Sequence, residues 1–161
     1  IKLGDWVQVG SSAGYVTDIS VRATTIETFD QADVIIPNAD FISGTVTNMT
    51  HNNKRGRIKI PVGVAYDSDP EQVKQLLLEI VDNHDMILKK PGPSVFLLGF
   101  GADSIDFEIR GILRDINYVT STRSDINFEI LKVFAQEGIE IPFGQREIRI
   151  KNAAELGKAL K

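Results

Sequence analysis

Side chains that commonly bind metals or transfer protons are few in this sequence, and they stand apart. His51 and His84 are the two histidines, and neither has a partner at a metal-binding spacing such as His-x-x-x-His. Asp67, Asp69 and Glu71 lie close together, but the twelve-residue calcium loop with its central Gly is missing. These three acids are better explained by the start of a helix, where acidic side chains cap free N–H groups.

A second pattern, Gly99-Phe100-Gly101, resembles the beginning of a dinucleotide fingerprint. It lacks the third Gly and falls between two predicted strands, which favours a plain hairpin turn. No phosphate-binding loop and no nucleophile motif of the Gly-x-Ser-x-Gly type occurs. We therefore expect no enzyme activity, no catalytic residue, no metal site and no cofactor.

Composition narrows the remaining classes of function. The 161 residues are 42% hydrophobic and 25% charged, which is typical of a folded globular chain, and the absence of Cys excludes disulfides and thiolate metal sites. A net charge of -4 disfavours nucleic-acid binding, which needs many cations. The densest cationic patch, made of Lys54, Arg55, Arg57 and Lys59, is predicted to be a solvated strand end.

No stretch of the sequence has the ~18 apolar residues of a membrane-spanning helix. The chain begins at Ile1 rather than Met and enters a patterned segment at once. We expect it to be a piece of a longer protein whose preceding part includes membrane spans.

Residues 1–50 predict a small β-barrel or sandwich, because short runs rich in Thr, Val and Ile alternate with turn residues. Pro37-Asn38 is predicted to end the fourth strand. Trp6 is expected to pack on the barrel, with an approach to lipid headgroups as the alternative. The predicted strands are Trp6–Val9, Tyr15–Ile19, Thr24–Phe29, Val34–Ile36 and Thr45–Met49.

A second pattern begins after the polar segment 51–56, where we expect a domain boundary. Alternation predicts strands at 57–64, 95–100 and 105–113. Ser68-Asp69-Pro70-Glu71 predicts a helix start, and the helix should end at Asn83-His84. A second helix is expected over 121–137, with Ile126, Ile130, Leu131 and Phe134 on its buried face, followed by an extended segment over 139–150. Strand, helix, strand, strand, helix, strand is the order of a ferredoxin-like fold.

The ordered set of motifs in this chain resembles the mechanosensitive channels of the small-conductance (MscS-like) family. The resemblance covers residues 4–150. In the second half it is carried by Val62–Asp69 and Ile141–Ile148. One departure is Gly144, where the family usually has a second Pro. In the first half the resemblance is carried by Gly4, Asp5, Gly14, Arg22, Pro37 and Asn38.

The resemblance implies an α+β chain without enzyme activity, in four parts. An Sm-like β-barrel domain spans 1–53 and a ferredoxin-like domain spans 54–142. A strand over 143–150 joins a barrel shared between subunits, and the tail spans 151–161. That shared barrel would use Gln145, Arg146, Glu147, Ile148, Arg149 and Ile150.

The resemblance also implies where the chain works. It would be the vestibule of a homoheptameric channel, on the cytoplasmic side of a bacterial inner membrane, that releases solutes on hypoosmotic shock. Its partners would be identical subunits and the membrane, reached through helices upstream of Ile1, with no nucleic acid. The alternatives are a ligand-binding regulatory domain, which a ferredoxin-like fold also permits, and a small RNA-binding barrel, which the acidic charge disfavours.

Overall fold

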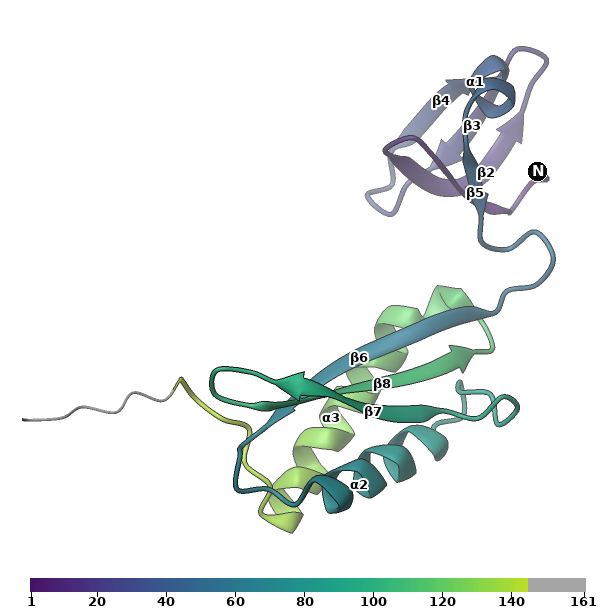
Figure 1. Cartoon of the computed structure of the whole chain (residues 1–161). Coiled ribbons are helices and arrows are strands. Elements are labelled where there is room, and N and C mark those ends of the chain that lie inside the picture. Colours follow the sequence, from purple (N-terminus) through teal and green to yellow (C-terminus); the bar gives the residue numbers. More distant parts are fainter. Residues whose placement is uncertain (145–161) are drawn as a thin grey trace, which may run out of the picture.

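The computed structural model describes residues 1–144, which form two antiparallel sheets joined by a short linker (Figure 1). We refer to residues 1–50 as the N-terminal unit and to residues 56–144 as the C-terminal unit. The expected mixed α+β class is confirmed. Within residues 1–144, no helix combines the length and the hydropathy that crossing a membrane requires.

The N-terminal unit is a five-stranded sheet in the order β4-β3-β2-β1-β5. Each strand matches a predicted run within a few residues. Because inward side chains alternate along the strands, a small core forms from Val7, Val16, Ile26 and Ile36. The strands are β1 (Trp6–Val9), β2 (Ser12–Ile19), β3 (Ala23–Glu27), β4 (Asp33–Pro37) and β5 (Val46–Asn48).

A six-residue helix, α1 (Asn38–Ser43), connects β4 to β5 and was not predicted from the sequence. None of its side chains is fully buried: Phe41 packs against the core of the N-terminal unit, and Ile42 is 87% exposed. A helix this short and this exposed has no apolar periodicity, so the pattern that reveals longer helices is absent.

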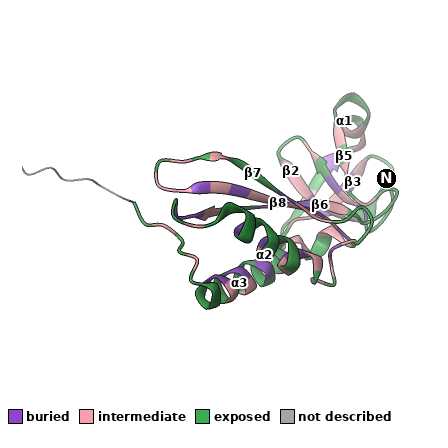
Figure 2. Ribbon diagram, turned by 60° about the horizontal axis from the view of Figure 1, so that its bottom comes forward, coloured by how far each residue is buried: buried purple, intermediate pink, exposed green. Residues whose placement is uncertain are grey.

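The C-terminal unit is a three-stranded sheet in the order β6-β8-β7, with two helices packed on one face (Figures 1 and 2). Pro61 lies in β6, an edge strand of the sheet, where a residue without an N–H is tolerated. The buried side of the sheet and the inner faces of the helices share one core (Figure 2). The elements are β6 (Gly56–Val64), α2 (Pro70–Asp82), β7 (Ser94–Phe100), β8 (Ile105–Leu113), η1 (Ile116–Tyr118) and α3 (Val119–Glu137).

The predicted start and end of α2 are confirmed. Oδ1 of Asp69 accepts the N–H of Glu71 at 2.9 Å, Pro70 is the first helical residue, and Asn83 is the C-cap. On α3, a buried face recurs every four residues, at 122, 126, 130 and 134. Leu131 is 53% exposed, so its predicted place on that face was wrong, because it lies one position beyond the buried stripe.

The chain leaves α3 through Gly138, whose φ of 70° lies in the left-handed region that commonly ends a helix. In the extended segment expected over 139–150, residues 139–144 form no strand, although the N–H of Ala65 donates to the carbonyl of Glu140 at 2.9 Å. Residues 145–150, where the subunit-barrel strand was predicted, and the tail 151–161 lie outside the described residues.

Candidate functional site

Gly4 and Asp5, the first two motif residues, fasten the start of β1 to β2 and to the end of β5. Gly4 has a φ of 81°, which favours glycine, and its N–H donates to the carbonyl of Val16. The Asp5 side chain is buried, and its Oδ2 accepts the side-chain N–H of Asn48 at 2.8 Å and the backbone N–H of Lys2 at 3.1 Å. These bonds explain why a buried carboxylate is tolerated at this position.

Burial alone would raise the pKa of the Asp5 carboxyl, but the groups around it lower this pKa by more. The hydrogen bonds from Asn48 and Lys2, with the positive charge of Lys2, hold the pKa of the Asp5 carboxyl below its usual value. Asp5 is therefore ionised at neutral pH and serves as a structural acceptor.

At Gly14, strand β2 passes close to the end of β3. A Cβ at this position would lie 2.3 Å from the carbonyl oxygen of Glu27, a distance that no side chain tolerates. Because β2 and β3 are paired directly beside this contact, neither backbone is free to move away. The motif glycine is required by close strand packing.

Pro37 and Asn38 form a corner that holds the turn between β2 and β3. The Asn38 side-chain amide donates to the carbonyls of Ser20 at 3.0 Å and Val21 at 3.2 Å, and its Oδ1 accepts the Thr24 hydroxyl at 2.8 Å. The remaining motif residue of this group, Arg22, is exposed, and its backbone carbonyl accepts the Asn38 N–H. The structure thus places the six motif residues at three points: Gly4 with Asp5, Gly14, and Arg22 with Pro37 and Asn38.

The residues considered for chemistry occupy structural positions. Asp69 caps α2, and Nδ1 of His84 accepts the N–H of Met86 just beyond the end of that helix. Nε2 of His84 lies 3.7 Å from Oδ2 of Asp125 on α3. In residues 1–144, no group of three His, Asp or Glu side chains is arranged to hold a metal ion.

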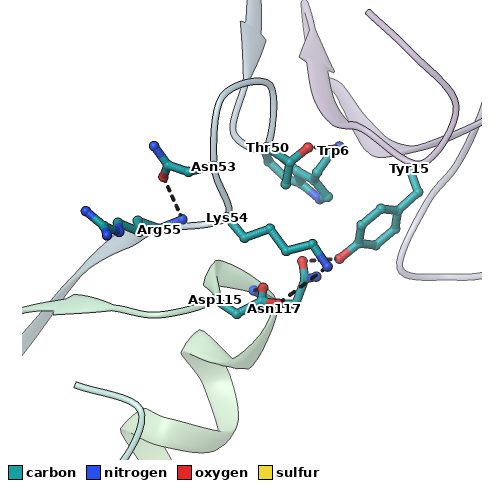
Figure 3. A network of polar contacts seen from close by, with 8 residues as sticks. All are labelled: Trp6, Tyr15, Thr50, Asn53, Lys54, Arg55, Asp115 and Asn117. Carbon is teal, nitrogen blue, oxygen red and sulfur yellow. Dashed lines mark hydrogen bonds and ion pairs between the residues drawn. The ribbon is translucent and has the colours of Figure 1, made fainter. Parts of the chain in front are cut away.

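The two units meet through a small set of contacts that the sequence did not reveal (Figure 3). The hydroxyl of Tyr15 on β2 donates to Oδ1 of Asn117 on η1. The backbone N–H of Ile116 donates to the carbonyl of Lys54 at 2.7 Å, and Nζ of Lys54 lies 3.7 Å from Asp115. We call this set the inter-unit junction.

Trp6 also lies at the junction. It faces Tyr15 across the β1–β2 pair, is half-buried, and its backbone N–H donates to the Thr50 hydroxyl at 2.8 Å (Figure 3). Trp6 and Tyr15 line a cavity together with Ile116 and Val119 of the C-terminal unit. The prediction that Trp6 packs on its own barrel was thus incomplete, because Trp6 also lines the cavity between the units.

The cationic patch singled out from the sequence is solvent-exposed at Lys54, Arg55, Arg57 and Lys59. Lys54 contributes to the junction through Asp115, with 64% of its side chain exposed. The alternation along β6 directs Arg57 and Lys59 away from the helices. The prediction that the cationic patch is a solvated strand end is therefore confirmed.

Comparisons with known proteins now identify the family. Residues 58–141 match the family described as "Mechanosensitive ion channel MscS, C-terminal", and residues 1–51 match "Mechanosensitive ion channel, beta-domain". This chain belongs to the MscS family of mechanosensitive ion channels. The proteins of this family are channels and not enzymes.

Relatives of the chain carry the same family name. It is 41% identical over 152 residues to an MscS family protein of Haemophilus influenzae and 36% identical over 152 residues to the mechanosensitive channel MscK of Escherichia coli. Each alignment covers 94% of this chain but 14% of the relative. The chain therefore spans a small part of these MscS-family proteins.

A solved structure agrees over most of the described residues. The crystal structure of Helicobacter pylori MscS in its closed state superposes with a TM-score of 0.86 at 27% identity. It covers 94% of this chain, and this chain covers 60% of it. The two units therefore have the fold of part of an MscS channel.

Proposed function

We propose that this chain is the cytoplasmic vestibule of a mechanosensitive channel that releases solutes on hypoosmotic shock. The observation that carries the proposal is the match of both units, in order, to the two MscS regions, together with the 0.86 superposition on a closed MscS channel. The pore would belong to the part of the protein that precedes residue 1.

In this proposal the parts have the roles that the resemblance gives them. Residues 1–53 form an Sm-like barrel domain and residues 54–142 a ferredoxin-like domain. Residues 143–150 supply one strand to a barrel shared by seven identical subunits, and the tail spans 151–161. The described sheets support assembly in one respect: β4 and β5 are the edge strands of the N-terminal sheet, and an edge strand can pair with another chain.

The N-terminal unit also has hydrogen bonds that would distribute a pulling force over several strands. Its first residues are tied to β5 through Asp5 and Asn48, and to β2 through the bond from the Gly4 N–H to the Val16 carbonyl. A pull applied at residue 1 would thus be shared by strands at the border and the centre of the sheet. We place the whole protein in a bacterial inner membrane, with this chain on the cytoplasmic side.

A survival assay tests the proposal. The full-length protein is expressed in bacteria that lack their own mechanosensitive channels, and the cells are shifted from high to low osmolarity. We expect survival well above that of cells with an empty vector, and a mass of seven subunits for the purified protein. Vector-level survival with the protein present in the membrane would contradict the proposal.

A further inference from the structure

The inter-unit junction borders a partly open cavity of about 270 Å³ with walls from both units. Trp6, Tyr15, Phe29 and Met49 line it on one side, and Ile116 and Val119 lie on the other. Small-molecule sites are commonly found between domains, in hollows with mostly apolar walls and a few polar groups. This cavity has that composition.

Two of the apolar side chains at the cavity remain largely open to solvent. Phe29 is 74% exposed and Met49 is 44% exposed. The ring of Phe29 meets that of Tyr15 edge to face, with centroids 6.2 Å apart and planes at 78°. The rings of Phe29 and Tyr15 and the thioether of Met49 therefore lie beside the cavity. Both kinds of group interact favourably with an aromatic ring.

The polar groups of the cavity favour a ligand with an acceptor. The Tyr15 hydroxyl donates to Oδ1 of Asn117, which leaves the side-chain N–H groups of Asn117 unused. Among the residues that the structure describes, neither these groups nor the indole N–H of Trp6 has a protein acceptor. A carbonyl or hydroxyl oxygen on a ligand would satisfy one of these donors.

Charge and size narrow the ligand further. Burial and the negative charge of Asp115 raise the pKa of the Tyr15 hydroxyl, which indicates that a second negative charge here is disfavoured. The volume lies just below the ~300–1,000 Å³ of sites for drug-sized molecules, so the cavity suits one or two rings.

We propose that the inter-unit cavity is a binding site for a small, neutral, planar aromatic molecule with a hydrogen-bond acceptor. Such a ligand would contact both units at once. It would therefore favour the arrangement of the units that the structure has, by binding that arrangement more tightly than a separated one. This site goes beyond the channel role and does not depend on it.

The test uses the chain of residues 1–161 and benzamide as the probe. Trp6 is the only Trp in the chain, so its fluorescence reports on the cavity directly. Met49 and Met86 are the only methionines, so the Met49 methyl signal in NMR spectra is a second report and Met86 an internal reference. We expect both Trp6 and Met49 to show a saturable change, with Met86 unchanged.

Ligand controls test the stated chemical class. Benzoate has the shape of benzamide but a negative charge, and hexanamide has the amide but no ring. We expect each to bind about tenfold more weakly than benzamide. Equal binding of benzoate or hexanamide, or no saturable change with benzamide, would overturn the proposal.

Matched variants locate the site. Thr120 lines the cavity and is exposed, so Thr120→Phe fills the mouth without disturbing a core. Ser124→Phe adds the same ring one turn along α3, where the residue is exposed and outside the cavity. With melting temperatures unchanged, Thr120→Phe should weaken benzamide binding about tenfold and Ser124→Phe by less than about twofold.

The same loss of binding in both variants would contradict the location, as would no loss in Thr120→Phe. A second copy of this chain is the other candidate occupant. Sedimentation of the free chain decides this: a dimer whose formation shifts the Met49 signal, with no response to benzamide, would show that the cavity is an interface between copies.

Discussion

Replacing Asn38 is the change that tests the N-terminal unit most sharply. Asn38→Ala removes two side-chain donors to exposed carbonyls and the acceptor for the Thr24 hydroxyl, which is buried. At about 0.5 kcal/mol for each exposed bond and about 1 kcal/mol for the buried one, the free energy of unfolding should fall by about 2 kcal/mol.

Asn38→Asp is almost the same size and should be more harmful than Ala at neutral pH. The carboxylate still accepts from Thr24, but it has no donor and faces the carbonyl oxygens of Ser20 and Val21. Acidification protonates the carboxylate and restores one donor, so the difference between the Asp and Ala variants should shrink as the pH falls.

Urea unfolding followed by Trp6 fluorescence is the assay, because the single Trp belongs to the N-terminal unit. Asn52→Ala is the control, since Asn52 is exposed in the linker, and it should change stability by less than about 0.5 kcal/mol. An Asn38→Ala loss no larger than that of the control, or an Asp variant as stable as the native chain, would refute this reading of the corner.

Three further predictions concern the motif and the junction. Gly14→Ala should lower the free energy of unfolding in urea by at least about 1–3 kcal/mol, because the added Cβ meets the backbone of Glu27. Gly99→Ala is the control, since its Cβ meets open space and should cause no such loss. Equal losses in the two variants would contradict this prediction. Because the pKa of Asp5 is lowered in the folded chain, its contribution to stability is present above about pH 4 and is lost as the pH falls through the folded pKa. Asp5→Asn should therefore lose less stability in acid than the native chain. The same dependence of stability on pH in both chains would count against this prediction. Tyr15→Phe removes the hydrogen bond to Asn117, so trypsin should cut the 51–55 linker faster; an unchanged cleavage rate would mean that this bond does not hold the units together.

Much of the strand and helix pattern was predictable because it follows from local chemistry. Strand alternation in β8, the Asp69-Pro70 start of α2 and the Gly138 stop of α3 all depend on neighbouring residues only. The exposed helix α1 has no apolar stripe, so sequence pattern did not reveal it. Leu131 was wrongly predicted to be buried, because it follows Ile130 directly and would belong to a wider apolar stripe. The stripe that α3 buries is narrower and leaves Leu131 exposed.

The roles of the motif residues and the junction depend on contacts between distant parts of the chain. Asn48 lies 43 positions from Asp5, and Asn117 lies 102 positions from Tyr15. No local rule relates such pairs. The sequence marked Gly4, Asp5 and Asn38 as family residues through resemblance, whereas the hydrogen bonds that explain them required the fold.

We propose that this chain serves a channel opened by membrane tension. The most direct test of this proposal is a patch recording of the full-length protein in membranes free of other mechanosensitive channels. We expect suction on the patch to evoke channel openings that are absent from patches without the protein. Patches that contain the protein in the membrane, yet stay silent up to the tension that ruptures them, would contradict the proposal.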